Sequence, residues 1–495
     1  MAKVLLINPN KWGRGITHIW IASHAGILKR NNHKVELFDA TFYSNWSLNE
    51  VQFQTDNKMY KKTNYDDFLK FNKNDIFEDL QKKINDLDPD FIFWSAISSH
   101  IHGEGEYVNL QNGYDLLKNL DTKNAILITG GLQATSAAEI ILNKMPKIKY
   151  VIGGESELVM LEVLNNFNNQ KKIKNSTIEL DKIEGISHVK NKKFIQNKKQ
   201  KIIDNLDYLT PYDYDIFDTQ VLNRPYNGQV IKAVDYEMSR GCIYSCNYCV
   251  ETIIQKYYDF QDFSPKTGAI KNFKSYLRSK SALKIFEEIT YLYQTKKIEL
   301  IRCQDTKFLT NDREVLVELA ELIDKSNLKI KIYIETRPEG INEKSIELLK
   351  KLKVDGVGMG VELSDSSFRE DELNRFADQE KTINAFKLLK KNNIKRTAYN
   401  IIGLPNQNEE SILKTIEFNK ILNPDNITVA YYSPYYGTKS QKKGNKLGIF
   451  DEYELDVDSA LRSKSKADDT LPVSRLDFYK KQFVSLVRNN AKQQN

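Results

Sequence analysis

Three cysteines stand close together in the chain, and cysteine thiolates are the usual ligands of iron–sulfur clusters. They are Cys242, Cys246 and Cys249, in the segment MSRGCIYSCNYCVE at 238–251, which follows a strand-like run. A four-iron cluster held by three cysteines keeps one iron without a protein ligand. That arrangement suits the binding and conversion of a substrate better than electron transfer alone. The spacing therefore predicts a catalytic 4Fe-4S cluster.

Structural zinc is the alternative for a cysteine cluster. Such sites are usually closed by four protein ligands. No fourth cysteine or histidine lies near the three cysteines, because all six histidines lie at or before His188. Cys303 is far along the chain in an apolar strand pattern, which is typical of a small buried hydrophobic residue. We therefore favour the open cluster.

The cysteine segment resembles the radical S-adenosylmethionine (SAM) superfamily. The resemblance rests on the spacing, on Gly241 before the first cysteine and on Tyr248 before the third. It implies that the cluster binds SAM at its open iron and cleaves it reductively to a 5′-deoxyadenosyl radical. The electron would come from a flavodoxin-type or ferredoxin-type donor. The resemblance also places Tyr248 beside the adenine.

Four later segments resemble stretches of the same superfamily, in the same order: QDTKF (304–308), GMGVEL (358–363), NIIGLPNQNEES (400–411) and PYYGTK (434–439). The resemblance implies SAM contacts for Asp305, Glu362, Gly403 and Pro405. Each segment also has a purely structural interpretation, since GVEL suits a core strand and Gly-Leu-Pro suits a turn. Their order behind the cysteines favours the SAM interpretation.

Strand and helix patterns alternate from residue 231 onward. The expected strands are 231–239, 298–304, 330–336, 356–362, 396–403 and 427–433, with helical patterns between them, such as 282–294 and 313–325. Six strand–helix units predict a partial (β/α)6 barrel with its site at the carboxyl ends of the strands.

The first part of the chain shows a second alternation. Short apolar strands are expected at 3–8, 34–39, 90–96, 125–130 and 149–154, and helices at 17–31, 107–119, 134–144 and 155–167. This pattern predicts an α/β, doubly wound (Rossmann-like) domain, whose ligands bind beyond the carboxyl ends of the strands. Residues 40–75 have no clear period and are interpreted as an insertion or lid.

This first domain resembles the cobalamin-binding domain that precedes the radical SAM core in one subgroup. The resemblance lies in VLLINPN (4–10), HKVELFDA (33–40), ITGGLQAT (128–135) and VIGGESE (151–157). It implies cobalamin contacts for Ser99, Gly130, Gly131, Gln133, Gly153, Gly154 and Glu155. The Asp-x-His-x-x-Gly signature of a cobalt-ligating histidine is absent. The alternatives are cobalamin bound without a protein histidine and an empty domain that shapes the substrate pocket.

Four segments follow from these patterns: a cobalamin-binding-like domain at 1–167, a linker with a hairpin at 168–230, the radical SAM core at 231–440 and a helical extension at 441–495. The net charge of +7 comes from 73 basic and 66 acidic residues and predicts no nucleic-acid binding. No apolar run approaches the roughly 20 residues of a membrane span, and no signal peptide is visible, so we expect a cytoplasmic protein.

The function predicted from these features is a cobalamin-dependent radical SAM enzyme that transfers a methyl group to an unactivated carbon of a small molecule in a biosynthetic pathway. One alternative is a radical rearrangement or cyclisation without net methylation. Another, from a different class, is a non-catalytic iron–sulfur binding protein. A methylthiotransferase is disfavoured, because residues 1–241 contain no cysteine for a second cluster.

Overall fold

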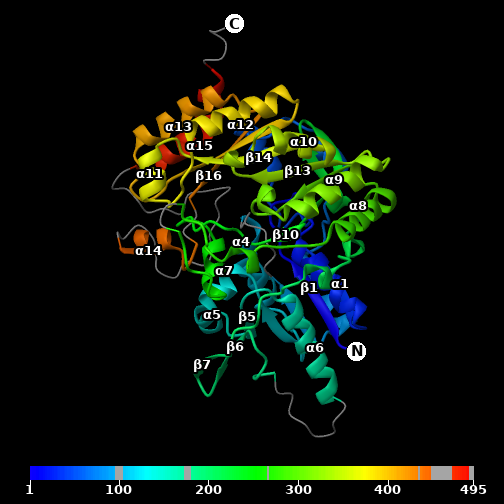
Figure 1. Cartoon of the computed structure of the whole chain (residues 1–495). Coiled ribbons are helices and arrows are strands. Elements are labelled where there is room, and N and C mark those ends of the chain that lie inside the picture. The colour runs from blue at the N-terminus through cyan, green and yellow to red at the C-terminus, as the bar shows by residue number, and fades with distance from the viewer. Residues whose placement is uncertain (95–103, 172–179, 265–266, 433–434, 447–470, 490–495) are drawn as a thin grey trace.

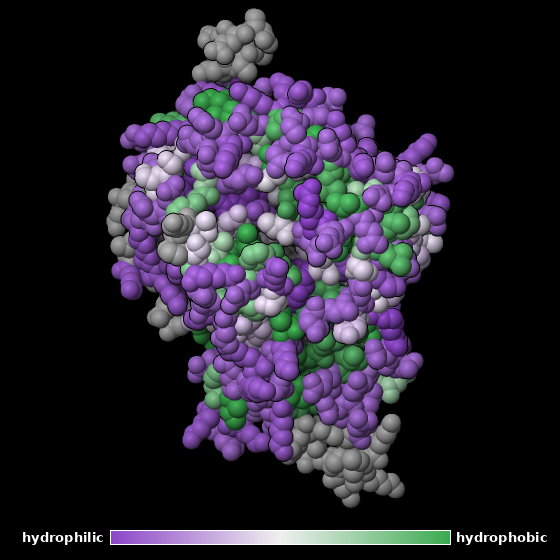
Figure 2. All heavy atoms as spheres, in the orientation of Figure 1, coloured by the Kyte–Doolittle hydropathy of each residue, from purple (hydrophilic) through white to green (hydrophobic). Residues whose placement is uncertain are grey.

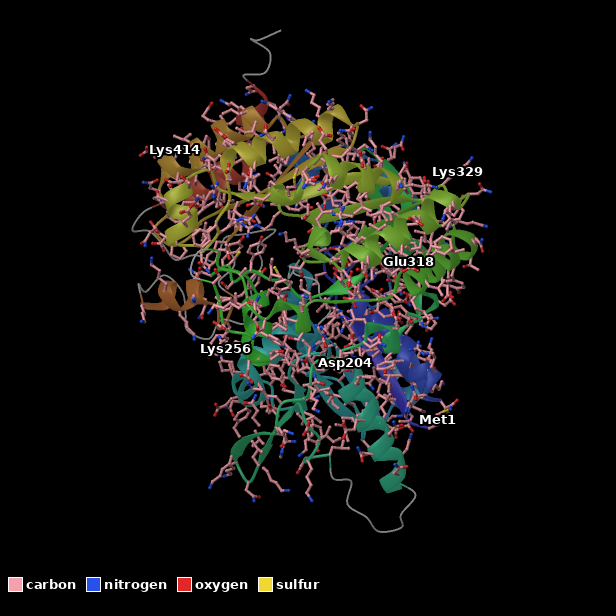
Figure 3. All side chains as sticks on the ribbon, in the orientation of Figure 1. Met1, Asp204, Lys256, Glu318, Lys329 and Lys414 are labelled. Atoms are coloured by element: carbon pink, nitrogen blue, oxygen red, sulfur yellow. The ribbon has the colours of Figure 1, made fainter. Side chains whose placement is uncertain are left out.

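The computed structural model describes all residues except 95–103, 172–179, 265–266, 433–434, 447–470 and 490–495. Two α/β parts are stacked on each other, and the chain runs from the lower part, blue to cyan, into the upper part, green to red (Figure 1). Met1 lies on the lower part, and Lys329, just before β13, and Lys414, on α13, lie on the upper one (Figure 3).

A seven-stranded sheet forms the first part, in the order β2-β1-β3-β4-β5-β6-β7. The first five strands are parallel, and β6 and β7 add an antiparallel hairpin at the edge. Their bounds are β1 Lys3–Asn8, β2 Lys34–Asp39, β3 Phe91–Trp94, β4 Ile126–Thr129, β5 Ile148–Ile152, β6 Ile186–Lys190 and β7 Lys193–Gln196. The predicted doubly wound sheet is confirmed, and the hairpin predicted after residue 168 extends it.

Six helices accompany this sheet within the described residues. They are α1 Ile19–Arg30, α2 Glu50–Asp56, α3 Ile76–Leu87, α4 Glu104–Leu117, α5 Leu132–Lys144 and α6 Glu157–Lys171. The sequence interpretation did not include α3, although its signals are local. Asp75 caps the amino terminus by accepting from the N–H groups of Phe77 and Glu78, and Ile76, Leu80 and Ile84 recur at helical spacing on the buried face.

The second part contains the six predicted parallel strands plus an antiparallel edge strand, β8, in the order β16-β15-β14-β13-β12-β9-β8. The bounds are β8 Asn223–Tyr226, β9 Gln229–Tyr236, β12 Leu300–Cys303, β13 Lys331–Thr336, β14 Val354–Glu362, β15 Lys395–Ile402 and β16 Asn426–Tyr431. Between β9 and β12, the short strands β10 Ser239–Arg240 and β11 Arg278–Ser279 pair with each other. The partial barrel is therefore confirmed.

The helices of the second part are α7 Glu251–Tyr257, α8 Ala282–Lys296, α9 Arg313–Lys325, α10 Glu343–Lys351, α11 Ser366–Asp371, α12 Gln379–Lys391, α13 Glu409–Leu422, α14 Lys439–Lys446 and α15 Val473–Arg488. Most begin at a side-chain cap. Ser281, Asp312 and Asn408 accept from backbone N–H groups in the first turns of α8, α9 and α13. These caps fix where each helix begins, and therefore the loops at the barrel mouth.

None of the described helices is long and apolar enough to span a membrane. Hydrophilic residues cover most of the face shown in Figure 2, and apolar residues appear there in small separate groups. The two parts share one hydrophobic core, which includes Leu5 and Phe93 of the first sheet together with Ile301 and Ile332 of the second. The halves are thus packed against each other as one folded unit.

Candidate active site

The loop that carries the three cysteines lies between β10 and α7, at the carboxyl end of the barrel sheet. Gly241 opens it with φ +101, and a side chain there would stand 2.6 Å from the carbonyl oxygen of Tyr276, so only glycine fits. The Gln255 side chain donates to the carbonyl groups of Cys242 and Tyr244, at 2.8 Å each. The N–H of Cys242 donates to Glu251 at 3.0 Å. The first turns of α7 therefore hold the loop in shape.

The thiols of this loop are largely removed from solvent. Cys242 and Cys246 are buried, and Cys249 is half-buried. Burial raises the pKa of Cys242 to about 12, and the Glu251 carboxylate acts in the same direction. Burial and the neighbouring Cys246 and Cys242 thiols also raise the pKa of Cys249. These three sulfur atoms thus lie within electrostatic reach of one another, and a positively charged iron cluster is the partner that would ionise them.

Zinc and a four-iron cluster require different arrangements of the thiols. Within the described parts of the chain, no three His, Cys, Asp or Glu side chains converge closely enough to hold a single metal ion. A zinc site requires all its thiolates at about 2.3 Å from one ion. The cysteines of a four-iron cluster each bind a different iron and stand farther apart. Ligation of the cluster by Cys242, Cys246 and Cys249 stays a prediction, and Cys303 is buried in the core at 1% exposure.

Cationic side chains surround the cysteine loop. The Lys307 ammonium donates to the Tyr244 hydroxyl at 3.0 Å, and Lys307 and Arg337 lie 4.4 and 4.0 Å from the centre of the Tyr244 ring. The positive charge of Lys307 acts to lower the pKa of Cys242. The negative charge of Cys246 acts to raise the pKa of Arg375. A cluster bound by three thiolates carries negative charge, which these cations would stabilise.

Tyr248 and Glu362, both predicted SAM contacts, meet beside this loop. The Tyr248 hydroxyl donates to Glu362 Oε1 at 3.0 Å, and Arg375 stands 3.6 Å from the same oxygen. Glu362 has φ +61 at the end of β14, where the register with β15 shifts. An ordinary side chain avoids this conformation, and such strain is common at functional sites.

The turn after β15 completes this corner. Gly403 has φ +81, and its N–H donates to Gln407 Oε1 at 2.7 Å. The next residue, Leu404, belongs to a small buried cluster against which Tyr248 packs, and Pro405 beside it is buried. The structure therefore brings Tyr248, Glu362 and the Gly403–Pro405 turn together, as expected of parts of one ligand site, although their contacts with SAM stay a prediction.

Asp305, also a predicted SAM contact, has protein partners on the strand that leads to the cysteines. Its carboxylate accepts from the Met238 N–H and the Ser239 hydroxyl at 2.7 Å each, and from Asn311 at 2.5 Å. Burial raises its pKa. Asp305 thus fixes the end of β12 against the segment before the cysteine loop, and its contact with SAM stays a prediction.

A cavity of about 390 Å³ runs through the barrel from Cys249 to β8. Strand residues that point inward form one wall. The other wall comes from the first part of the chain, mainly the loop after β1 and the segment around α2, which belongs to the 40–75 region. The lining includes Trp12, Arg14, Ile16, His18, Glu50, Tyr60, Arg224, Asp235, Tyr248, Arg302, Tyr333, Glu335, Glu362, Tyr399 and Tyr431. Burial lowers the pKa of His18 to about 4, so its imidazole is neutral at neutral pH.

Comparison with known proteins identifies the second part of the chain. Residues 236–418 match the family model of the radical SAM superfamily. They form a radical SAM domain. Members of that family use a 4Fe-4S cluster and SAM. The three cysteines are therefore the candidate site for the cluster, and the Tyr248–Glu362 pair is the candidate site for SAM.

Several known proteins resemble more of the chain than the radical SAM domain alone. The anaerobic magnesium-protoporphyrin IX monomethyl ester cyclase of Rubrivivax gelatinosus is 25% identical over 76% of this chain, which spans 63% of that protein's length. An uncharacterized methyltransferase of Pyrococcus horikoshii is 23% identical over 73% of this chain and 71% of its own. The structure of TsrM from Kitasatospora setae, a radical SAM methyltransferase, matches with a TM-score of 0.65 at 12% identity, over 90% of this chain and 75% of that one. This last likeness shows a common fold.

The glycines predicted to contact cobalamin fall into two groups. Gly131 has φ +103 at the start of α5. A side chain added to Gly130 would make only ordinary contacts, the nearest at 3.4 Å. Gly153 and Gly154 instead lie against α7 of the radical SAM domain. A side chain on Gly153 would stand 2.8 Å from the Tyr257 ring, and one on Gly154 would stand 2.4 Å from the Tyr258 hydroxyl.

Glu155 lies in a buried ion network between the two parts. It pairs with Arg278 of β11 at 2.8 Å and with Arg240 of β10 at 3.4 Å. Arg240 also pairs with Glu157 at 2.7 Å and with Glu237 at 2.6 Å. Gln133 is buried on α5, and Ser99 lies outside the described residues. In the structure, Gly153, Gly154 and Glu155 contact residues of the radical SAM domain. Cobalamin contacts at all of these positions stay predictions.

Sequence reasoning missed the charged residues that line the barrel. Asp235, Arg302 and Glu335 lie on β9, β12 and β13, in runs that were interpreted only as strands. Their inward direction depends on strand pairing, since Arg302 stands opposite Asp235 and Tyr333 in the neighbouring strands. The sequence did contain one signal for these residues. A charged residue between apolar ones is unusual in a buried parallel strand and indicates a position that faces a cavity.

Proposed function

We propose that the chain is a cobalamin-dependent radical SAM enzyme that transfers a methyl group to an unactivated carbon of a small molecule. The observation that carries the proposal is the placement of the two sheets. The carboxyl end of β5, at Gly153 and Gly154, packs against α7, which directly follows the cysteine loop. A cofactor at the carboxyl edge of the first sheet would therefore lie beside the cysteine loop of the radical SAM domain.

The first sheet is suited to a large cofactor. Its order β2-β1-β3-β4-β5 places the topological switch point between β1 and β3, where open α/β sheets bind ligands. The loop after β1 extends from this point into the barrel cavity, through Trp12 and Ile16. Gly130 and Gly131 keep the end of β4 free of side chains, which permits close approach of a large group. The relation to TsrM, described with cobalamin and a 4Fe-4S cluster bound, supports the same cofactors here.

The chain's own residues hold the reactants and exclude water. Cys242, Cys246 and Cys249 would bind the cluster, and Tyr248 with Glu362 would orient the adenosine and methionine portions of SAM. The cluster and SAM, when bound, supply a carbon-centred radical that removes a substrate hydrogen, and cobalamin supplies the methyl group. The wall contributed by the first part of the chain closes the barrel, which protects such chemistry from solvent.

Cyclisation or rearrangement without net methylation is the second candidate. It is supported by the 25% identity to the magnesium-protoporphyrin cyclase of Rubrivivax gelatinosus. Both reactions would use the same cluster, SAM and electron donor of the flavodoxin or ferredoxin type. They differ in whether a second SAM is consumed to recharge cobalamin with methyl.

The first test concerns the cluster and SAM. Full-length protein reconstituted without oxygen should hold about four irons per chain and, once reduced, form 5′-deoxyadenosine from SAM. Alanine at Cys242, Cys246 or Cys249 should abolish both, and Cys303→Ala, at a cysteine outside the loop, is the matched control. Full iron content in the triple alanine variant would refute the assignment of these ligands.

The second test distinguishes the two reactions. Protein incubated with hydroxocobalamin should retain it through gel filtration. With its substrate, a methyltransferase must produce S-adenosylhomocysteine as well as 5′-deoxyadenosine. An enzyme that converts its substrate and forms 5′-deoxyadenosine alone would support cyclisation or rearrangement instead.

A further inference from the structure

Arg302 occupies a central position in the wall of the barrel cavity. Leu300, Arg302 and Gln304 alternate along and just after β12, and all three line the cavity. In the neighbouring strands Arg302 stands opposite Asp235 of β9 and Tyr333 of β13. Its guanidinium therefore enters the lumen between two flanking strands, where a substrate would be held.

The other two guanidinium groups of the cavity have close carboxylate partners. Arg14 pairs with Glu50 at 2.8 Å, and Arg224 pairs with Asp235 at 2.6 Å. Asp235 accepts further hydrogen bonds from Thr17, at 3.1 and 3.2 Å, and from Gln304, at 2.8 Å. These contacts use the hydrogen-bonding capacity of the Asp235 carboxylate, so little of it remains for a second cation.

Arg302 is the guanidinium of this wall that lacks such a partner. Its ion pair with Asp235 is long, at 3.9 Å, and among the described residues its guanidinium makes no hydrogen bond. The guanidinium lies 5.8 Å from the Tyr333 ring centre. Its side chain is 29% exposed although it belongs to an interior strand, and that exposed surface faces the cavity. A guanidinium has five N–H donors, which are available here to a ligand that enters the cavity.

We propose that Arg302 binds a carboxylate of the substrate, and that the substrate is a small aromatic carboxylate. The planar guanidinium matches a carboxylate with two parallel hydrogen bonds. Tyr333 and Tyr399, whose hydroxyl groups are 2.9 Å apart, and Tyr431 present aromatic surface to the same cavity. The cavity of about 390 Å³ also reaches Tyr248 and Glu362, so SAM would share it and leave room only for a small substrate.

SAM is a second source of a carboxylate in this enzyme. Its predicted contacts, Tyr248 and Glu362, meet at the end of β14, and β13 separates that strand from β12. Arg375 is the cation nearest that corner, at 3.6 Å from Glu362. We therefore assign Arg302 to the substrate, and the experiment separates the two sources. The assignment rests on the proposed function only in treating the cavity as the substrate site.

The test compares benzoate with benzamide, which has the same ring and no charge. Binding to the cluster-loaded full-length protein is measured by equilibrium dialysis or ligand-observed NMR, without turnover. Benzoate should bind at least about tenfold more tightly than benzamide, the size expected of a charge-assisted hydrogen-bonded pair. Arg302→Gln should remove that preference, Arg302→Lys should keep part of it, and Arg313→Gln, at an exposed arginine, should keep all of it.

Several outcomes would overturn the proposal. Absence of benzoate binding, equal affinity for the two ligands, or a preference for benzoate that survives in Arg302→Gln would each do so. The same holds if Arg302→Gln weakens SAM binding about tenfold and leaves the benzoate preference intact, because Arg302 would then bind SAM. If that variant fails to fold, the comparison in the wild-type protein decides. A separate measurement tests the proposed function: if that function is wrong, the wild-type protein will not cleave SAM.

Discussion

At the scale of single residues, Glu362 combines backbone strain with a position in the site. Its φ of +61 is unfavourable for a glutamate, and a side chain on nearby Gly360 would stand 2.3 Å from its Oε1. The carboxylate is held by the Tyr248 hydroxyl and by Arg375. The surrounding structure therefore fixes the carboxylate in one place, as expected for a group that orients a ligand.

We expect Glu362→Gln to weaken SAM binding more than Tyr248→Phe does. The first change removes the charge that would bind the ligand, whereas the second removes one supporting hydrogen bond, worth about 0.5–1.5 kcal/mol, and keeps the aromatic face. Equilibrium dialysis of SAM against cluster-loaded protein measures both. Equal affinity in all three proteins would show that SAM binds elsewhere. Iron content confirms that each variant retains its cluster.

Residues were predictable where the signal is local in the chain. Cys242, Cys246 and Cys249 stand within one loop, so their spacing alone indicated a shared ligand. Arg302 and Asp235 become neighbours only when β9 pairs with β12, which no local pattern records. Glu155 illustrates a third case. Its position after β5 indicated a ligand site, but its partners Arg240 and Arg278 come from the other half of the molecule.

At the scale of elements, the junction of β5 and α6 with β10 carries the contact between the halves. Arg240 is 2% exposed and pairs with Glu155, Glu157 and Glu237. Burial disfavours ionisation of Glu237, but the charge and hydrogen bonds of Arg240 outweigh it and lower the pKa of Glu237 to about 2. The stability that this carboxylate contributes is therefore present above its unfolded pKa, about 4.3, and lost as pH falls towards 2.

Arg240→Met should destabilise the protein by about 3–5 kcal/mol at neutral pH, because it leaves Glu157 and Glu237 buried without their cation, while Glu155 keeps Arg278. Without Arg240, burial raises the pKa of Glu237, so the variant loses stability as pH rises, the opposite of the wild-type trend. The difference in melting temperature between the two proteins should therefore widen from pH 5 to pH 8. Arg313→Met, at an exposed arginine, should show no such widening. A difference independent of pH would contradict the account.

Two glycines after neighbouring strands should respond differently to alanine. Gly154→Ala places a side chain at φ +73 and 2.4 Å from the Tyr258 hydroxyl, so it should destabilise the protein by about 1–3 kcal/mol. Gly130→Ala meets only ordinary contacts and should leave the melting temperature nearly unchanged. If cobalamin lies at the end of β4, bulkier Gly130→Leu should reduce its retention in gel filtration. Unchanged retention would place the cofactor elsewhere.

At the scale of the whole molecule, the fold class was predictable because strand–helix alternation is a repeated signal. Both parallel sheets follow from it. The edge strand β8 and the hairpin β6–β7 are antiparallel additions that the alternation does not encode. The contact between the halves could not be predicted from the sequence either, because it depends on Thr17 of one half and Asp235 of the other. Their pairing is visible only in three dimensions.

That contact predicts that the two halves unfold together. The Thr17 N–H and hydroxyl donate to Asp235 at 3.1 and 3.2 Å, and the Asp235 N–H donates back to the Thr17 hydroxyl at 2.7 Å. Thr17→Val removes the two side-chain bonds and leaves a buried carboxylate less well satisfied. Amide hydrogen exchange should therefore accelerate in β1 and in β13 alike, although β13 does not touch the altered residue.

Thr295→Val, at an exposed threonine that bonds only within its own helix, is the control and should leave both unchanged. Faster exchange confined to β1 would mean that the halves are separable, and the shared core would then not transmit stability from the first sheet to the radical SAM domain.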